Sequence, residues 1–297
     1  MNERTDGITL RTYILQTEET FDRAKLHFGH GTADPLDEAA WLAGSALGIN
    51  PDDLETFLDK ALTGDELRLL DGLVCERIET RKPVAYLLNE AWFAGHRFFI
   101  DERALIPRSL IGEYIQEQFQ PWVGMNSVHS VLDLCTGSGC IAIAMALEFP
   151  DASIDAVDIS TDALAVANRN ITDYALEDRV NLIQSDLFEM LGGRHYDLII
   201  SNPPYVPQSS MDLLPAEYNH EPTLALKADD NGLAIINTIL ENTSDYLNEE
   251  GLLIVEAGES REAVDEKYSD ISFTWLAHES GEEAVFLLGK KDLESFR

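Results

Sequence analysis

The sequence predicts an α/β protein built on a doubly wound, seven-stranded, mostly parallel sheet, with an N-terminal helical domain and a connecting β-hairpin. Residues 1–88 carry apolar side chains at mixed spacings of three and four, as amphipathic helices do. From about residue 130 onward, short β-branched runs alternate with helical segments. This alternation indicates right-handed βαβ crossovers and an open sheet with helices on both faces.

Two parts are expected before the sheet. The first is a helical domain with breaks at Gly31, Asn50-Pro51 and Gly64, and its predicted helices cover residues 17–28, 36–47, 54–62 and 66–78. The second lies between residues 89 and 108, where aromatic and β-branched side chains become frequent and Gly95-His96 offers a turn. We interpret it as a β-hairpin that joins two domains; a short extended linker is the alternative.

The sheet is predicted from seven short strand-like runs. They cover residues 131–134, 154–157, 180–183, 198–201, 252–255, 272–276 and 284–288. Helical segments separate most of them, at residues 141–148, 162–171, 233–246 and 261–268. Only a short turn at residues 279–282 joins the last two strands, so we expect these strands to pair antiparallel.

The chain is strongly acidic. It has 21 Lys and Arg residues against 54 Asp and Glu residues, which gives a formal net charge of −33. Phosphate backbones attract proteins through Lys and Arg, so this charge disfavours direct binding of nucleic acid and favours a basic protein partner. The alternative is that the acidity serves solubility or adaptation to salt.

Cysteine content and hydropathy predict a cytoplasmic protein. The three cysteines form no C-x-x-C pair and have no His cluster nearby, so we expect neither disulfides nor a metal site. The first residues lack a basic segment followed by an apolar one, so no secretory signal is expected. No apolar run approaches the roughly 20 residues that span a bilayer, so we expect no membrane partner. No pattern indicates the oligomeric state.

A glycine-rich loop follows the first strand of the predicted sheet and leads directly into a helix. Gly137 and Gly139 let the backbone pass close to a ligand, while the first N–H groups of the helix point at it. A nucleoside derivative is the expected ligand, although the spacing alone also fits a dinucleotide fingerprint. Asp133 favours S-adenosylmethionine, because a carboxylate inside an apolar strand needs a partner and the ammonium of that cofactor supplies one. A structural hydrogen bond is the alternative role of Asp133.

Two further acidic residues follow the next strands. Asp158 lies about 20 residues beyond Gly137, which places its carboxylate where it accepts from both ribose hydroxyls. Asp186 is expected to accept from the adenine amine, with Leu187 packed on the ring. An ordinary helix N-cap at Ser185 or Asp186 is the alternative.

The most specific pattern is Asn202-Pro203-Pro204-Tyr205, after the fourth strand. Consecutive prolines fix φ and lack N–H groups, so we expect the Pro203 carbonyl to point outward as an acceptor beside the side-chain carbonyl of Asn202. These two oxygens would bind both hydrogens of a planar NH₂ group, favour a pyramidal nitrogen and stabilise the positive charge that develops during methyl transfer. No general base is needed, and Tyr205 would pack over the planar group. The alternative is a plain Asn-Pro turn.

Several other residues stay open between two roles. Arg108, the pair Glu221-Pro222 and the residues from Asp229 to Gly232 either line the substrate mouth or serve as caps and solvated turns. Cys135 and Cys140 flank the glycine loop without a nearby His, so we interpret them as small buried fillers rather than nucleophiles.

These motifs resemble those of the class I S-adenosylmethionine-dependent methyltransferases that modify planar NH₂ groups, with the protein glutamine methyltransferases as the closest branch. The resemblance implies a substrate-recognition domain at 1–88, a β-hairpin linker at 89–108 and a methyltransferase domain at 109–297. It implies that S-adenosyl-L-methionine, which leaves as S-adenosyl-L-homocysteine, contacts Cys135, Thr136, Gly137, Ser138, Gly139, Asp158 and Leu187. It also implies that the substrate glutamine is held by Asn202, Pro203, Pro204 and Tyr205.

Two stretches favour one substrate within this branch. Residues 91–96 and residues 106–113 resemble the enzymes that methylate a glutamine of large-subunit ribosomal protein L-three, a basic protein. Enzymes acting on peptide chain release factors, the first alternative, usually carry Pro-Glu-Thr-Glu after the Pro-Arg pair. Methylation of an adenine amine in nucleic acid and a non-catalytic cofactor-binding assembly module are the more distant alternatives. Residues 227–232 depart from the family pattern, because they lack the glycine and the Asp-Gly pair expected there.

Overall fold

The computed structural model describes residues 7–124, 128–277, 281 and 283–296. These residues form two compact units, one extending to Glu90 and including Pro215–His220, the other made of Ala91–Leu214 and the residues from Glu221 onward. Two predictions concern residues outside these ranges. The predicted absence of a secretory signal concerns the first six residues, and the predicted turn at 279–282 lies mostly outside the described residues. Within the described ranges, no helix is long and apolar enough to cross a membrane.

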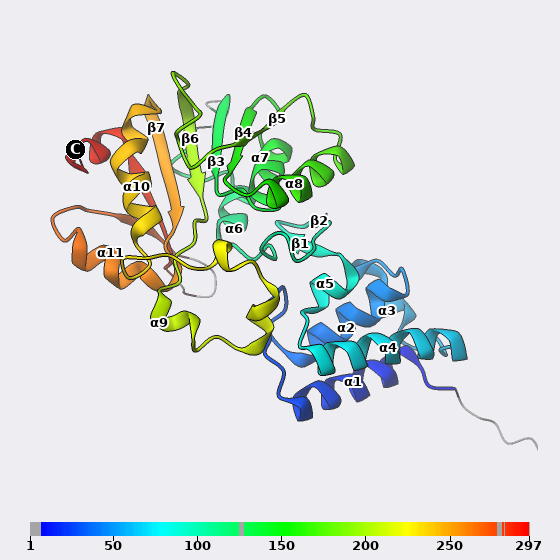
Figure 1. The fold of residues 1–297 in the computed structure, drawn as a ribbon. Helices are drawn as coiled ribbons and strands as arrows, with labels where there is room; N and C mark the ends of the chain where they lie inside the picture. Colours follow the sequence, from blue (N-terminus) through cyan, green and yellow to red (C-terminus); the bar gives the residue numbers. More distant parts are fainter. Residues whose placement is uncertain (1–6, 125–127, 278–280, 282, 297) are drawn as a thin grey trace, which may run out of the picture. The chain divides into compact units, whose positions relative to one another are not determined.

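The first unit is helical (Figure 1). Its helices are α1 (Leu10–Ala24), α2 (Pro35–Ala46), α3 (Leu54–Phe57), α4 (Gly64–Thr80) and α5 (Val84–Leu88). The predicted boundaries of the first helix, 17–28, are wrong. The side chain of Thr9 accepts from the N–H of Thr12 and begins α1 earlier, and Lys25 ends the helix in the left-handed region at φ 51°. Fully buried apolar side chains form the core, including Leu10, Phe21, Leu42 and Leu70.

A buried ionic network lies in this helical unit. Arg77 is fully buried, and it donates from Nε to Glu38 at 2.8 Å and from Nη1 to Glu217 at 3.4 Å. Its Nη2 donates to the carbonyl of His27. Glu217 also accepts from the N–H of His27 and from Arg81. These contacts hold the downstream segment Pro215–His220 in the helical unit. No sequence pattern indicates this.

The second unit contains the hairpin and the sheet. The hairpin strands β1 (Ala91–Phe93) and β2 (His96–Phe98) pair antiparallel, and α6 (Ile111–Gln116) follows them. Among the described residues, seven strands form one sheet in the order β5-β4-β3-β6-β7-β9-β8. They are β3 (Ser130–Leu134), β4 (Ser153–Asp158), β5 (Val180–Gln184), β6 (Tyr196–Ser201), β7 (Leu247–Glu256), β8 (Thr274–Leu276) and β9 (Val285–Gly289). β3 to β7 are parallel and β9 is antiparallel to β7 and β8, so the predicted fold class and closing strand pair are confirmed.

Helices cover both faces of the sheet (Figure 1). Successive side chains of a strand point to opposite faces, so Val131 packs with α7 (Cys140–Glu148) whereas Leu132 packs with α10 (Ala234–Asn242). α8 (Thr161–Asp173) contacts α7. The face of α10 also receives α11 (Arg261–Lys267) and α12 (Lys290–Leu293).

The strand order reverses between β3 and β6. From β3 the chain moves outward to β4 and β5, then returns to β6 and β7 on the other side of β3. Ligands of open α/β sheets bind outside the carboxyl ends of the strands at such a switch point. Leu134, the last residue of β3, pairs with Ser201, the last residue of β6. The glycine loop and the Asn202 loop therefore start side by side.

Candidate active site

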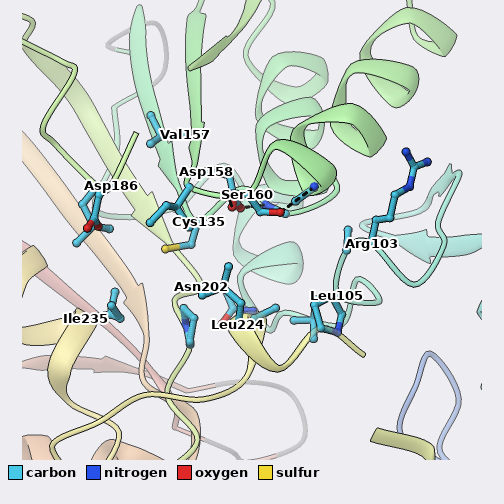
Figure 2. A pocket seen from close by; sticks show the side chains of 18 of the residues that line it. Arg103, Leu105, Cys135, Val157, Asp158, Ser160, Asp186, Asn202, Leu224 and Ile235 are labelled. Atoms are coloured by element: carbon cyan, nitrogen blue, oxygen red, sulfur yellow. Dashed lines mark hydrogen bonds between the residues drawn. The ribbon is translucent and has the colours of Figure 1, made fainter. Parts of the chain in front are cut away.

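A cavity of about 230 Å³ lies at this carboxyl edge of the sheet (Figure 2). Loops after β3, β4, β5 and β6 contribute to its walls, and the predicted site residues that line it are Cys135, Gly137, Asp158, Asp186, Leu187, Asn202 and Pro204. The remaining predicted residues belong to the same strand ends and loops without lining the cavity: Asp133, Thr136, Ser138, Gly139, Pro203 and Tyr205. Several residues predicted for the cofactor thus line the same cavity as Asn202 and Pro204, two of the four residues predicted for the substrate.

Asp133 holds the glycine loop from within the sheet. The residue is fully buried, and its Oδ2 accepts from Thr136 Oγ1 at 2.5 Å and from the N–H of Ala142 at 3.1 Å. Burial raises the pKa of Asp133 to about 7. Among the described residues, no donor reaches its Oδ1. The structural hydrogen bonds of the alternative reading are therefore present, and the contact with a cofactor ammonium stays a prediction.

Backbone conformation shapes the loop after Asp133. Gly137 and Gly139 have φ angles of 57° and 79°, in the left-handed region that favours glycine. A Cβ on Gly139 would come within 3.1 Å of the Cβ of Ala167, so α8 packs directly on the loop. Cys135 also has a positive φ of 61°, and burial raises the pKa of its thiol. A protonated thiol is a poor nucleophile. Cys135 nevertheless lines the cavity and is not the buried filler that was expected, whereas Cys140 is buried.

Asp158 connects the glycine loop to the start of α8. Its Oδ2 accepts from the N–H of Gly137 at 2.8 Å, and its Oδ1 accepts from the N–H of Ser160 at 2.9 Å (Figure 2). Burial raises the pKa of Asp158. Since each carboxylate oxygen has two lone pairs, both oxygens keep a further acceptor site for the predicted ribose hydroxyls.

Asp186 and Leu187 lie in the turn after β5. The N–H of Ser185 donates to the carbonyl of Asp158 at 3.1 Å, and Ser185 Oγ accepts from the N–H of Met190 at 3.1 Å. Residues 186–190 form a bend and turns rather than a helix, so the alternative of a helix N-cap is wrong. Leu187 adopts a φ of 44° and lines the cavity with Asp186.

The Asn202 loop follows β6 and is fixed at its far end by backbone pairing. The N–H of Val206 donates to the carbonyl of Leu226 at 2.9 Å, and the N–H of Ala228 donates to the carbonyl of Val206 at 2.9 Å. Across the described part of the chain, no hydrogen bond reaches the Asn202 carboxamide or the Pro203 carbonyl. Asn202 lines the cavity together with Asp158, so its carboxamide is available to a ligand there (Figure 2).

Tyr205 makes contacts with β7 and with the residues that follow it. Its hydroxyl donates to Glu256 at 3.1 Å, and a Cβ on Gly258 would overlap its ring. The ring therefore lies against the backbone of Gly258 and does not line the cavity. That Tyr205 packs over a planar substrate group stays a prediction, and in this structure its hydroxyl is engaged by Glu256 and part of its ring lies on Gly258.

Most of the residues left open between two roles make structural contacts. Arg108 donates to both carboxylate oxygens of Glu221, at 2.6 and 2.8 Å, and Glu221 also accepts from the N–H of Ile106. The turn at 229–232 does not line the cavity, and its Gly232 lies against the carbonyl of Tyr205. Of this group only Pro222 lines the cavity.

Two wall segments were not predicted. The first segment follows the hairpin, and the second follows Glu221, the partner of Arg108. Their cavity-lining residues include Arg103, Ala104, Leu105, Leu224, Ala225 and Lys227. The chain before the first segment is secured by Asn170 of α8. This buried side chain accepts from the N–H of Phe99 at 2.8 Å and donates to the carbonyls of Phe99 and Ser138 at 3.0 and 2.9 Å. An Asn on the apolar face of a predicted helix is the signal that marks this contact, because a buried amide needs partners.

Two family models match parts of the chain, and one of them describes a methyltransferase domain. Residues 121–217 match the Methyltransferase small domain family, and residues 24–88 match the PrmC N-terminal domain family. The fold is similar to that of the hMettl16 catalytic domain in complex with MAT2A 3'UTR hairpin 1, with a TM-score of 0.52, 12% identity and coverage of 98% of this chain and 95% of that chain. At this identity the likeness concerns the fold alone.

Relatives of nearly full length narrow the class. The chain is 46% identical over 290 residues to the ribosomal protein uL3 glutamine methyltransferase of Francisella tularensis, covering 97% of this chain and 92% of that protein. It is 46% identical over 286 residues to the protein of the same name from Neisseria meningitidis serogroup B, covering 96% and 94%. The chain belongs to the family of ribosomal protein uL3 glutamine methyltransferases.

Proposed function

We propose that this enzyme transfers a methyl group from S-adenosyl-L-methionine to the side-chain amide nitrogen of a glutamine in ribosomal protein uL3, the L-three protein of the large subunit. The observation that carries the proposal is the Asn202 carboxamide, which accepts no hydrogen bond from the described residues and lines one cavity with Asp158 and Asp186. Membership of the uL3 enzyme family supports the choice of substrate.

The residues around the cavity fit this cofactor. S-adenosyl-L-methionine supplies an electrophilic methyl group on a sulfonium and leaves as S-adenosyl-L-homocysteine. Asp158 and Asp186 present carboxylates next to the apolar side chains of Ile159, Leu187 and Ile235, a set that suits ribose hydroxyls and an aromatic base. The predicted contact between Asp133 and the ammonium would require a movement of the glycine loop, because the Oδ1 of Asp133 is buried and Asp133 does not line the cavity.

Asn202 and Pro203 would bind and orient the amide. The Asn202 Oδ1 and the Pro203 carbonyl oxygen each accept one amide hydrogen, which turns the nitrogen lone pair toward the methyl group. Both oxygens carry partial negative charge, so they stabilise the positive charge that builds on nitrogen. After transfer the nitrogen is acidic and loses its proton to water without a general base.

The acidity of the enzyme suits a basic ribosomal protein. A net charge of −33 accelerates encounter with a positively charged partner and repels free nucleic acid. This electrostatic contribution weakens as salt is added, because exposed charges are screened beyond a Debye length of about 10 Å at 0.1 M ionic strength. We expect the reaction to take place in the cytoplasm, where ribosomal proteins are made.

The substrate assignment predicts selective labelling. Purified enzyme incubated with labelled S-adenosyl-L-methionine should transfer label to uL3, with mass spectrometry placing the added methyl group on one glutamine. A release factor and duplex DNA, tested in parallel, should stay unlabelled, and the KM for uL3 should rise with salt. Preferential labelling of the release factor or of DNA would refute the uL3 assignment, and labelling of none would leave a cofactor-binding module.

Asp158→Ala should weaken cofactor binding by roughly 10- to 100-fold, because hydrogen bonds to a charged group contribute about 1.5–3 kcal/mol. The measurement is the Kd of S-adenosyl-L-homocysteine by titration calorimetry. Asp155→Asn is the matched control, since Asp155 lies on the same strand but pairs with Arg194, and it should leave the Kd unchanged. An unaltered Kd in Asp158→Ala would remove this carboxylate from cofactor binding.

A further inference from the structure

Glu256 is a buried carboxylate on which three donors converge. It ends β7 and is 4% exposed. Its Oε2 accepts from Ser109 Oγ at 2.6 Å and from the N–H of Leu110 at 3.0 Å, and its Oε1 accepts from the Tyr205 hydroxyl at 3.1 Å. Burial raises the pKa of Glu256, whereas these hydrogen bonds favour its ionised form. Glu256 does not line the cavity, so any effect it has on the reaction must act through another residue.

Tyr205 is that residue, because contacts hold its hydroxyl, its ring and its carbonyl. Ser260 Oγ donates to the Tyr205 carbonyl at 2.8 Å. Gly258 has a φ of 49° and Gly232 a φ of 88°, and a Cβ at either position would overlap the ring or the carbonyl of Tyr205, respectively. Two glycines, a serine and a glutamate thus fix one tyrosine that does not itself face the cavity.

The two prolines before Tyr205 carry this constraint to the amide-binding oxygens. Each proline ring locks its own φ, so Pro203 and Pro204 leave little rotational freedom between Tyr205 and Asn202. An error of 1 Å in the position of a reacting group can lower the rate by about 100-fold. The orientation of the Pro203 carbonyl therefore depends on how firmly Tyr205 is held.

We propose that Glu256 is a positioning residue that orients the Asn202 and Pro203 acceptors by fixing the hydroxyl of Tyr205. This inference rests on the proposed function, since it assigns Glu256 a part in aligning the substrate amide. It further assigns Ser109 and the N–H of Leu110 the task of orienting the Glu256 carboxylate, so that Oε1 faces the tyrosine.

A double-mutant cycle tests the proposal. Glu256→Gln and Tyr205→Phe should each lower kcat for uL3 by about 10- to 100-fold, with the Kd of S-adenosyl-L-homocysteine unchanged. The double variant should lose little more than either single variant, because the two residues act through one hydrogen bond. Asp197→Asn is the matched control. Asp197 also accepts several hydrogen bonds, but it lies at the start of the neighbouring strand β6. The kcat of this variant should equal that of the parent. Additive losses, or an unchanged kcat in Glu256→Gln, would overturn the proposal.

Amide hydrogen exchange of the full chain gives a readout that needs no methyl transfer. The Tyr205 and Val206 amides should exchange faster in Glu256→Gln and in Tyr205→Phe than in the parent or in Asp197→Asn. If the parent enzyme fails to methylate uL3 but exchange accelerates, the proposed substrate is wrong and the positioning role stands. If exchange is unaltered, the positioning role is wrong whatever the substrate. Should Glu256→Gln fail to fold, Tyr205→Phe, which removes only a hydroxyl, decides both readouts.

Discussion

Replacing Asn202 with alanine is expected to lower kcat for uL3 by roughly 10²–10³-fold, the loss typical when one stabilising group is removed from an oriented polar site. The physical reason is that one of the two acceptors for the amide hydrogens disappears. The nitrogen then keeps its planar, delocalised lone pair, and its developing charge loses a partner. The Asn202 carboxamide makes no hydrogen bond to the described residues, so its removal should leave the fold intact.

The measurement is steady-state kinetics with uL3, together with the Kd of S-adenosyl-L-homocysteine, which should stay close to that of the parent. Asn202→Asp keeps an acceptor oxygen at the same place and should retain more activity than the alanine variant. Asn181→Ala on β5 is the control, because this exposed amide bonds only to Asp155 among the described residues. Unaltered turnover in Asn202→Ala would exclude Asn202 from the mechanism.

Arg77→Met should destabilise the helical unit by about 3–5 kcal/mol, the usual cost of breaking a buried ion pair by removing one partner. The guanidinium of Arg77 is fully buried between Glu38 and Glu217, which are themselves 1% exposed. Without it, the carboxylate of Glu38 loses its arginine, and Glu217 keeps only Arg81 as an ionic partner among the described residues. Burial already raises the pKa of Glu38, so this group is the least able to stay charged alone.

Hydrogen exchange of the α4 amides is the suitable measurement, since it reports on the helical unit alone when the chain does not unfold in one step. Arg68→Met on the same helix removes an exposed pair with Asp65 and should change little. Adding Glu38→Gln and Glu217→Gln to Arg77→Met should restore part of the stability, because no buried charge then lacks a partner. A small effect of Arg77→Met alone would show that the network is not important for stability.

The architecture of the sheet could be predicted because its signals are local. Each buried parallel strand is a short apolar run, and the helices between them have their own periodicity. Both boundaries of the first helix were wrong, because the N-terminal cap at Thr9 and the left-handed conformation of Lys25 leave little trace in hydrophobic spacing. Crossover rules restrict the possible topologies, but the strand order itself comes from the structure.

The candidate site was predictable where function and strand ends coincide. Asp158 and Asn202 end or directly follow their strands, so placing the strands placed both at one cavity. The contact between Tyr205 and Glu256 could not be predicted, because the two residues are 51 positions apart in the chain. A sequence motif shows which residues are neighbours in the chain, but not which distant residues contact them in the fold.

By itself, the sequence determined the fold class, the glycine loop, the acidic strand ends and the paired prolines that stiffen the Asn202 loop. These follow from backbone sterics and from the alternation of apolar residues, which act over a few positions. Only the tertiary structure decided that residues 103–105 and 222–227 complete the cavity, that residues 215–220 join the helical unit, and that Glu256 holds Tyr205. The reason is that each depends on satisfying buried polar groups with partners distant in the chain, and such pairing has no period that a sequence displays.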